Sequence, residues 1–504
     1  MNKIKNLLWG LLLAAPLLFL ATGCKKFLDR KPLTATLDDL NQGGIEGQIY
    51  GLYGAIRNGD VAGQGFGGIP WLAVHNFRSD DSEKGSDPGD GADWAVIHDQ
   101  FQYVKDHWST NTYWDHHYVL IGQANTALQL ADSLGLTTDV NSMTNIAEAR
   151  FFRAFAYFDL VRTYGEVPLI NFRVYSPADA RRPKSTIPQI YAQIDSDLQY
   201  AIANLPPNWN NATGNSRFPG RLTKYAAMAL QAKAMLYRQN WTGALGLCQQ
   251  IIGSGQFSLT TDFDKIFTDA GENNAESLFE IQADVGQNGA DNYFSWHAIA
   301  QGVRGAGDWD LGWGWNAPTQ ELVDAFPTGD KRRAATILFS GQADGVYGRV
   351  LPTFPTIPRR YWNKKVYPSP TQQTFTGNRQ GGWINQRVLR LADVILMAAE
   401  AANEIGGATN ANLAQNWLNQ IRTRAGLGNV TFVDQAQMRT AIQNERRYEL
   451  ALEGERFFDL VRWNLATSVL GPLGYQHKNR FYPIPQPAID FAGPTVLIQN
   501  PDYP

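Results

Sequence analysis

Tryptophans in glycine-rich segments are the residues of this chain whose type and spacing best suit contact with a ligand. Trp309, Trp313 and Trp315 stand within ten residues that also hold three glycines (307–316). Glycine-rich segments with large aromatic side chains are an unusual way to form a core. They are well suited to expose flat apolar ring faces, with polar edges, to a ligand. Sugar rings fit such faces, because their axial C–H bonds stack on an indole while their hydroxyls bind polar side chains. The pattern therefore favours a sugar-binding surface, with packing in a core as the alternative for each ring.

The candidate residues of this surface lie in, or directly after, two parts of the chain, residues 59–93 and residues 255–383. Both parts are rich in Gly, Pro and aromatic residues and show little helical periodicity. Long irregular loops on a rigid helical scaffold are where binding usually occurs. The aromatic candidates are Trp94, Trp296, Trp309, Trp313, Trp315 and Tyr293, and the weaker polar candidates, each with a structural role as its alternative, are Asn76, Arg78 and Asp93.

Motifs for catalysis or metal binding do not accompany these aromatics. The sequence has no nucleophile elbow, phosphate-binding loop or HExxH zinc motif. His107 and the pair His116-His117 are near in sequence, but adjacent histidines on a helix point apart, so a shared metal is not expected. The pair Asp80-Asp81 with Glu83 could bind calcium or supply acids, although a solvated acidic loop is the commoner outcome. We predict a protein that is not an enzyme and that needs neither a metal nor a cofactor.

The composition is that of a folded protein with no preference for nucleic acid. Of the 504 residues, 44% are hydrophobic and 18% are charged, which is enough apolar surface for a large core. The formal net charge of −3 provides no basic field to attract a phosphate backbone. Nucleic acid is therefore not an expected partner.

The first residues have the layout of a secretory signal that ends in a lipidation site. Lys3 and Lys5 precede a leucine-rich run over residues 7–20, which is short for a membrane-spanning helix. The run leads into Leu20-Ala21-Thr22-Gly23-Cys24, which resembles a bacterial lipobox. We expect residues 1–23 to be removed and Cys24 to carry acyl chains that anchor residues 24–504 to a membrane; an ordinary signal peptide with an incidental cysteine is the alternative. Only Cys248 would then remain, so no intramolecular disulfide is possible.

Amphipathic periodicity predicts helices that come in pairs. Apolar residues recur at helical spacing, and alanines on the inner faces allow close approach between two helices joined by a short turn. This is the pattern of tetratricopeptide-like hairpins. We predict a mainly α fold, with paired helices at 221–238 and 242–252 and at 387–405 and 412–424, and further helices at 145–164, 187–204 and 437–465.

A repeated pentapeptide links two of the predicted helices. Phe158-Asp159-Leu160-Val161-Arg162 recurs as Phe458-Asp459-Leu460-Val461-Arg462, with the apolar residues in equivalent phase. The two helices should therefore pack in similar ways. The helical regions predict a scaffold over about residues 30–254 and 386–504, and the glycine-rich texture between them predicts a loop-rich insertion over about residues 255–385.

The C-terminal region carries the most specific resemblance to known proteins. Residues 444–463 (NERRYELALEGERFFDLVRW), the ending Tyr482-Pro483-Ile484-Pro485 and the run Glu148–Leu169 are similar to motifs of the SusD/RagB family of outer-membrane nutrient-binding lipoproteins. Within the first motif, Glu453, Arg456, Asp459 and Arg462 are spaced by three, which would place opposite charges side by side on one helix. We interpret this row as structural, because hydrolysis of a glycoside needs two carboxylates that face the substrate.

The resemblance implies a function as well as a fold. It implies a lipid-anchored protein at the outer face of the outer membrane that captures poly- or oligosaccharide for a SusC-like TonB-dependent transporter. It also implies that the glycan site takes one aromatic from the N-terminal loop region and others from the insertion. Three alternatives stay open: a surface glycoside hydrolase, a peptide-binding member of the family, and a scaffold that binds only its transporter.

Overall fold

The computed structural model describes residues 44–57, 66–211, 214, 216, 218–290 and 293–503. Residues 49–504 form one compact unit, and the few described residues before them belong to a separate unit. The predicted lipidation site Cys24 and residues 59–65 of the first predicted loop lie outside the described residues.

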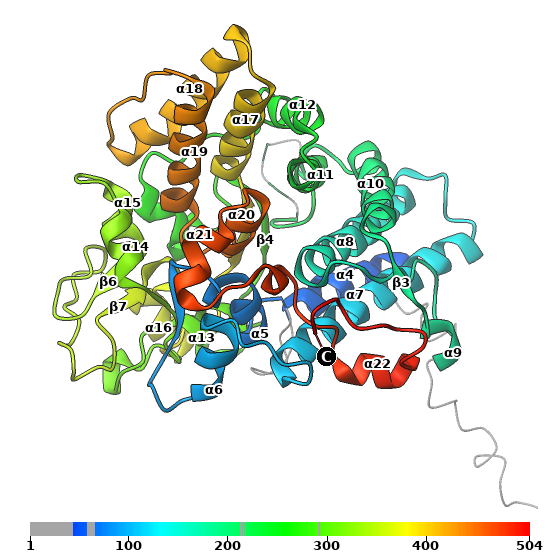
Figure 1. Ribbon diagram of the computed structural model, residues 1–504, viewed down its shortest axis with the longest axis horizontal. Coiled ribbons are helices and arrows are strands. Elements are labelled where there is room, and N and C mark those ends of the chain that lie inside the picture. Colours follow the sequence, from blue (N-terminus) through cyan, green and yellow to red (C-terminus); the bar gives the residue numbers. More distant parts are fainter. Residues whose placement is uncertain are drawn as a thin grey trace, which may run out of the picture. The chain divides into compact units, whose positions relative to one another are not determined.

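Helices that pack in sequence order form the scaffold of the larger unit, as the mainly α prediction requires (Figure 1). Each helix contacts the next along the chain, and α17 also packs against α19. The predicted hairpins α11/α12 and α17/α18 are confirmed. The scaffold helices are α7 (Trp108–Ser133), α8 (Val140–Tyr164), α10 (Ile187–Asn204), α11 (Lys224–Tyr237), α12 (Trp241–Ile252), α17 (Leu391–Ile405), α18 (Ala408–Ala425) and α19 (Gln435–Leu450).

Local sequence explains where these helices begin and how closely they approach. α10 has the predicted bounds, because Thr186 and Gln189 form a capping box at its start and Pro188 occupies its first turn. On α11, small side chains allow α10 and α12 to pack close to its backbone. The fully buried alanines of α11 are Ala226, Ala227, Ala229, Ala232 and Ala234.

The helix predicted over residues 437–465 is two helices. α19 ends at Leu450, and α20 (Arg456–Arg462) begins after a break. Gly454 in the break has a φ of +88°, and a Cβ there would lie 2.9 Å from Trp71, so only glycine fits. The predicted row of alternating charges therefore does not lie on one helix: Glu453 pairs with Lys365 and Arg390, and Arg456 pairs with Asp80.

The repeated pentapeptides pack alike and against each other. In each copy the aspartate pairs with the arginine three residues later, at 2.6 Å for Asp159–Arg162 and 2.7 Å for Asp459–Arg462. The guanidinium of Arg162 lies 4.3 Å from the ring centre of Phe458 in the other copy. The two predicted helices therefore meet at this repeat and join the N-terminal and C-terminal parts of the scaffold.

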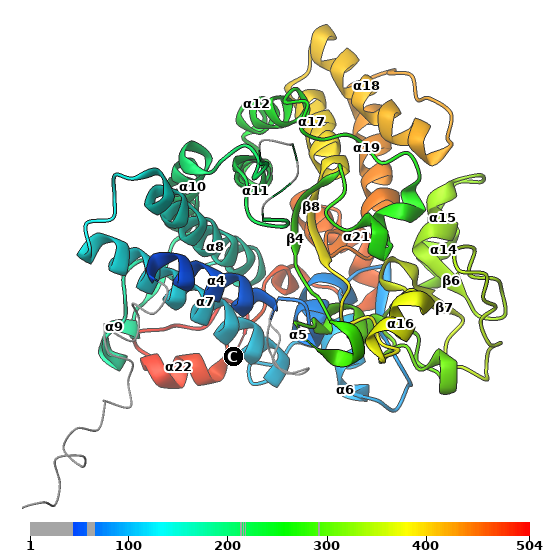
Figure 2. The ribbon, with the colours of Figure 1, turned by 180° about the vertical axis from the view of Figure 1, so that it is seen from behind.

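One of the short antiparallel strand pairs joins the insertion to the first residues before α17, and others lie within the insertion or within the scaffold. β4 (Ser277–Ile281) pairs with β8 (Gln386–Arg390), which leads directly into α17, so the first residues of the helix predicted from 387 are strand (Figure 2). β6 (Ile337–Phe339) pairs with β7 (Tyr361–Asn363) within the insertion. β2 (Val167–Pro168) pairs with β3 (Lys184–Ser185) between α8 and α10.

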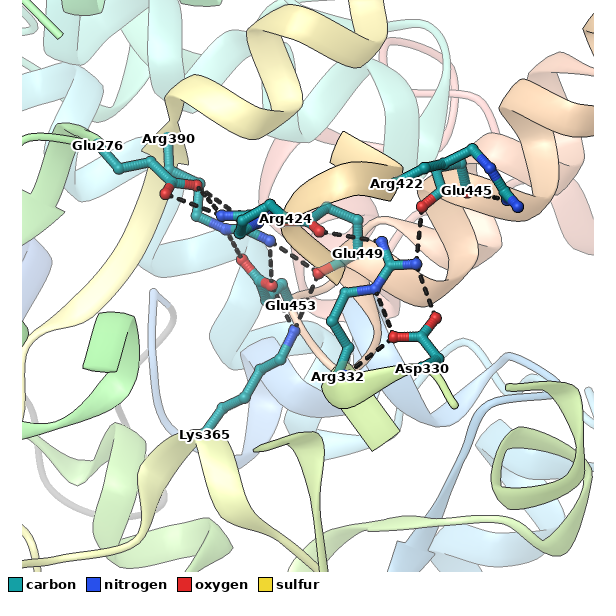
Figure 3. A network of polar contacts seen from close by, with 10 residues as sticks. All are labelled: Glu276, Asp330, Arg332, Lys365, Arg390, Arg422, Arg424, Glu445, Glu449 and Glu453. Atoms are coloured by element: carbon teal, nitrogen blue, oxygen red, sulfur yellow. Dashed lines mark hydrogen bonds and ion pairs between the residues drawn. The ribbon is translucent and has the colours of Figure 1, made fainter. Parts of the chain in front are cut away.

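A buried network of ion pairs lies where the insertion meets α19 (Figure 3). The carboxylate of Glu449 on α19 forms ion pairs with three guanidinium groups, those of Arg390 at 2.6 Å, Arg424 at 2.5 Å and Arg332 at 3.1 Å. Burial alone would raise the pKa of Glu449, but these three arginines outweigh burial and hold the pKa below its usual range. We call this set the Glu449 network; it comprises Glu276, Asp330, Arg332, Lys365, Arg390, Arg422, Arg424, Glu445, Glu449 and Glu453.

Candidate functional site

One strand pair joins the two loop regions from which the candidate residues come. β1 (Ser82–Gly85) pairs antiparallel with β5 (Trp315–Pro318), and Gly85 lies opposite Trp315. Gly85 has a φ of +78°, and a Cβ there would lie 2.5 Å from the carbonyl oxygen of Gly314, so the ladder requires glycine at this point. Segments more than 200 residues apart in the sequence thus become neighbours.

A buried lysine fixes the loop that follows β1. The ammonium of Lys84 donates to the carbonyls of Gly85 (3.0 Å), Asp87 (3.2 Å) and Asp90 (2.7 Å) and lies 5.3 Å from the ring centre of Trp315. Burial lowers the pKa of Lys84. From the other region, Arg304 pairs with Asp90. These bonds hold the loop in one conformation before any ligand arrives, which reduces the entropy lost on binding.

Trp94 and Trp315 lie in the core beneath this loop. Their rings are 5.1 Å apart in a T-shaped contact, and the ring of Phe77 stacks on Trp315 at 5.9 Å. Both tryptophans are almost completely buried. In this conformation neither ring presents a face to a ligand, so both take the packing role that the sequence left as the alternative.

Asn76 and Arg78 are also buried. The guanidinium of Arg78 lies 3.8 Å from the ring centre of Phe457 and 4.5 Å from that of Tyr482, and its Nε donates to the carbonyl of Val74 at 2.6 Å. Asn76 is 3% exposed. These two polar candidates therefore lie among core side chains, away from the surface.

Trp108, which is not among the predicted residues, is an exposed ring in this neighbourhood. It is 41% exposed at the first turn of α7 and contacts Trp94 at 4.9 Å. Beside it, the imidazole of His107 lies 3.4 Å from the exposed carboxylate of Asp93, a predicted candidate. An indole face next to a carboxylate is a suitable surface for a sugar ring. A tryptophan directly after His107 is the signal that could have identified it, but only the histidine was considered, for metal binding.

Trp296 and Trp313 form a second aromatic group. Both rings are half-buried and lie 5.7 Å apart, and Phe294 contacts Trp296 at 5.2 Å. Tyr293 is exposed, with the guanidinium of Arg57 5.1 Å from its ring centre. Three of the predicted residues are therefore at least partly accessible in the structure, and two of them, Trp296 and Trp313, are in ring contact.

Trp309 stands apart, with part of its ring covered. Arg349 places its guanidinium 4.1 Å from the ring centre, and the ring of Tyr367 lies parallel to it at 6.5 Å. The loop that carries Arg349 is held by Asp344, whose carboxylate accepts the backbone N–H groups of Val346 and Arg349. Arg349 would have to move before a sugar could stack on the face of Trp309 that it covers.

Comparisons with known proteins identify the family. A sequence profile described as the SusD family matches residues 275–503, and one described as starch-binding associating with outer membrane matches residues 62–236. The chain belongs to the SusD/RagB family. Two relatives come from Formosa agariphila: SusD-like protein P25 is 26% identical over 91% of this chain and 90% of its own, and SusD-like protein P2 is 29% identical over 80% and 82%.

Solved SusD-like proteins share the fold of this SusD/RagB chain. A laminarin binding SusD-like protein matches with a TM-score of 0.75 and 28% identity, over 91% of this chain and 99% of that one. Surface glycan-binding protein A from Bacteroides thetaiotaomicron, in complex with laminarihexaose, matches with a TM-score of 0.74 and 23% identity, over 90% and 98%. At 23% identity the likeness concerns the fold alone. These matches confirm the family and the mainly α fold predicted from the sequence.

The acidic residues considered for metal or acid chemistry are engaged in ion pairs in this SusD/RagB protein. The carboxylate of Asp80 accepts a hydrogen bond from Nε of Arg456 at 2.8 Å, and that of Asp81 accepts one from Nε of Arg447 at 2.7 Å. The expectation of a solvated acidic loop was wrong for this pair, because two arginines from the C-terminal motif cover it. Within the described ranges, no group of three or more His, Cys, Asp or Glu side chains is placed to hold a metal ion.

The histidines of this SusD/RagB chain point to different partners. His107 caps the start of α7, whereas His117 contacts Asp159 at 3.2 Å in the core. In the part of the chain that the structure describes, no helix combines the length and the apolar character needed to cross a bilayer.

Proposed function

We propose that this protein binds poly- or oligosaccharide at the cell surface and passes it to a TonB-dependent outer-membrane transporter. The observation that carries the proposal is the pairing of β1 with β5, which joins two aromatic-rich loop regions in a chain of the SusD/RagB family. A relative of the same fold and 28% identity is described as laminarin binding. The surface aromatics Trp108, Trp296 and Trp313 are the proposed contacts for sugar rings.

The chemistry of this surface suits capture of a polymer. Exposed or half-buried rings stack on sugars, while Asp93 and the loop fixed by Lys84 supply polar groups in a defined arrangement. Each ring contributes modestly, about 0.5–1.5 kcal/mol beyond the area that it buries. Weak binding of about −4 to −6 kcal/mol is sufficient for a protein anchored among many copies at a membrane, because the effective concentration is high.

Glycan binding is tested with a panel of soluble polysaccharides that includes laminarin. Isothermal calorimetry on the wild-type protein should detect at least one glycan ligand, and the double variant Trp296→Ala/Trp313→Ala should bind it several-fold more weakly. Because Trp313 packs partly against the main core, the affinity of the variant is measured at a temperature where circular dichroism shows that it is folded. A reducing-end assay on the same panel should detect no hydrolysis. A protein that binds none of the panel but releases reducing ends would support the hydrolase alternative and overturn the proposal.

Membrane anchoring through Cys24 is tested separately. The Cys24→Ser variant should lose lipid labelling and move from the membrane fraction to the soluble fraction. The Cys248→Ser variant is the control, because Cys248 is buried in the scaffold and should keep both properties of the wild type. Equal membrane association and labelling of the Cys24→Ser variant would contradict the anchor.

A further inference from the structure

An apolar pocket lies away from the aromatic loops, between α7, α22 (Gln486–Ala492) and the segment between β2 and β3. Its volume is about 360 Å³. Trp114 and Tyr118 of α7, Phe491 of α22 and Leu497 contribute to its apolar lining. Figure 1 shows α22 beside α7 and α9 (Pro177–Ala180) at this place. Among the described lining residues, Asp115 and Arg182 carry the only charges.

Three arginines belong to the segment between β2 and β3 that borders this pocket, and each lies over an exposed aromatic ring; Arg182 itself lines the pocket. The pairs are Arg173 over Tyr175 at 5.1 Å, Arg182 over Phe172 at 5.1 Å and Arg181 over Phe491 at 5.6 Å. The rings are 71%, 37% and 46% exposed, respectively. We call these six residues the arginine–aromatic patch.

The charges of the patch are available to a partner. Across the described residues, none of the three arginines forms an ion pair with a carboxylate; Arg173 donates to the side-chain amide of Gln129, and Arg182 donates to a backbone carbonyl. Residues 172–184 hold four basic residues and one acidic residue, in a chain whose net charge is −3. This segment is therefore a local cationic surface on an anionic protein, which favours an acidic partner.

The composition of the patch identifies the class of partner. Arg, Tyr, Phe and Trp are the residues enriched in the centres of protein–protein interfaces, where an anchor side chain fills a pocket. A sugar would meet few polar groups in this pocket, so a glycan does not fit. A two-fold contact with a second copy would set the patch against itself and bring like charges together, which is unfavourable.

We infer that the arginine–aromatic patch docks a protein partner that presents carboxylates around a protruding apolar side chain. The apolar side chain enters the pocket beside Phe491, and the carboxylates pair with Arg181 and Arg182. The inference rests on the proposed function for the identity of that partner, the TonB-dependent transporter. It adds the surface through which the two proteins meet, which is separate from the aromatic groups proposed for glycan.

Charge reversal at the patch tests this inference. The full-length protein is extracted from its own outer membrane in mild detergent and captured by an affinity tag, and the co-purifying β-barrel is identified and quantified by mass spectrometry. Arg181→Glu and Arg182→Glu should each lower the amount of barrel per captured protein about tenfold or more. Phe491→Ala should lower it without any change of charge, and Arg182→Lys should retain it.

The control is Arg360→Glu, because Arg360 also lies over an exposed ring, that of Phe354 at 4.6 Å, but outside the patch. It should leave the recovery of the barrel unchanged, and all variants should keep the wild-type melting temperature and glycan affinity. Full recovery of the barrel by both reversal variants would overturn the docking surface while leaving the proposed function intact. Absence of a barrel even with the wild-type protein would overturn both. Binding to protein-free anionic vesicles that the reversals abolish would assign the patch to lipid and overturn the inference.

Discussion

The Glu449 network and the aromatic loops use charge and aromatic rings in opposite ways. In the network, arginines and carboxylates are buried together and satisfy one another, with Glu449 receiving three guanidinium groups. In the loops, one buried lysine holds the backbone while Trp108 stays 41% exposed. The first arrangement defines one packing of the scaffold, and the second leaves an exposed ring beside a hydrogen-bonded loop, which is part of the surface proposed for the ligand.

The difference shows that the residues that identify the family and the residues proposed to bind glycan are separate. Glu445, Glu449 and Glu453 belong to the characteristic C-terminal motif, and all three lie inside the ion-pair network. Each of the three pairs with an arginine or lysine side chain. The motif therefore identifies the fold of the scaffold. The ligand has to be inferred from the loops, which carry no such motif.

Breaking the Glu449 network should give the largest effect. Glu449→Ala leaves three guanidinium groups without their shared acceptor, and removal of one partner from a buried ion pair costs about 3–5 kcal/mol. The urea midpoint of unfolding should fall accordingly. The control is Glu404→Ala, which removes a more exposed pair with Arg439 and should cost about 0–1 kcal/mol. Similar losses in both variants would remove the distinction between the network and an ordinary surface pair.

Shortening Trp315 should reveal a core residue within the loop region. Trp315→Ala should lower the free energy of unfolding by about 3 kcal/mol, because a large buried ring is lost. Its indole N–H has no hydrogen-bond partner in the part of the chain that the structure describes, so Trp315→Phe should restore much of the stability. Unfolding in urea measures both. A Trp315→Ala variant of normal stability that binds glycan poorly would instead return this ring to the ligand surface.

The carboxyl of Asp99 should make the loop region sensitive to pH. Burial raises its pKa to about 7 against the opposing effect of the Lys84 N–H, which donates to it at 3.1 Å. The unfolded chain releases this proton near pH 4, so the folded protein binds more protons between about pH 4 and pH 7, and its stability falls as pH rises through that range. Asp99→Asn should therefore be about 1–3 kcal/mol more stable than the wild type at pH 8 and equal near pH 4. Parallel stability profiles of the two proteins from pH 4 to pH 8 would contradict this assignment.

Removal of the exposed ring should give the smallest change in free energy. Trp108→Ala should weaken binding of a glycan ligand about two- to tenfold, because one stacking contact is lost. Calorimetry measures the affinity, and the melting temperature should change little. Phe375→Ala is the matched control, since it removes a similarly exposed ring elsewhere, 47% exposed and in the insertion, that is not proposed to bind. Equal affinities of the wild type and Trp108→Ala would exclude this ring from the platform.

Local signals in the sequence predicted the scaffold well. α10 was predicted with its observed bounds, because a capping box begins it and a proline follows in its first turn. The break between α19 and α20 was missed, because a single Gly454 within a helical pattern is usually tolerated. The need for a glycine there comes from Trp71 and His75, which approach it from a distant segment. That contact cannot be seen in local sequence.

The same limit explains the mixed outcome for the candidate tryptophans. Glycines beside tryptophans were interpreted as loops that present rings to a ligand, but at Gly91 the opposite holds. A Cβ there would lie 2.9 Å from Trp315 and 3.0 Å from Trp94, so this glycine lets the backbone approach two buried rings. Whether a tryptophan is exposed depends on which distant segments pack against it, as when β5 pairs with β1. No local sequence pattern encodes such contacts.

The aromatic rings packed against the guanidinium of Arg78 have a consequence for the order of folding. Its guanidinium is buried against Phe457 and Tyr482, almost 400 residues later in the chain. Likewise, Asn500 donates to the carbonyl of Tyr164 at 2.8 Å. Contacts of such long sequence separation form late and slow the folding reaction. The N-terminal half therefore cannot complete its core before the C-terminal region has been synthesised, and a chain truncated before residue 457 would leave a buried cation without its aromatic neighbours.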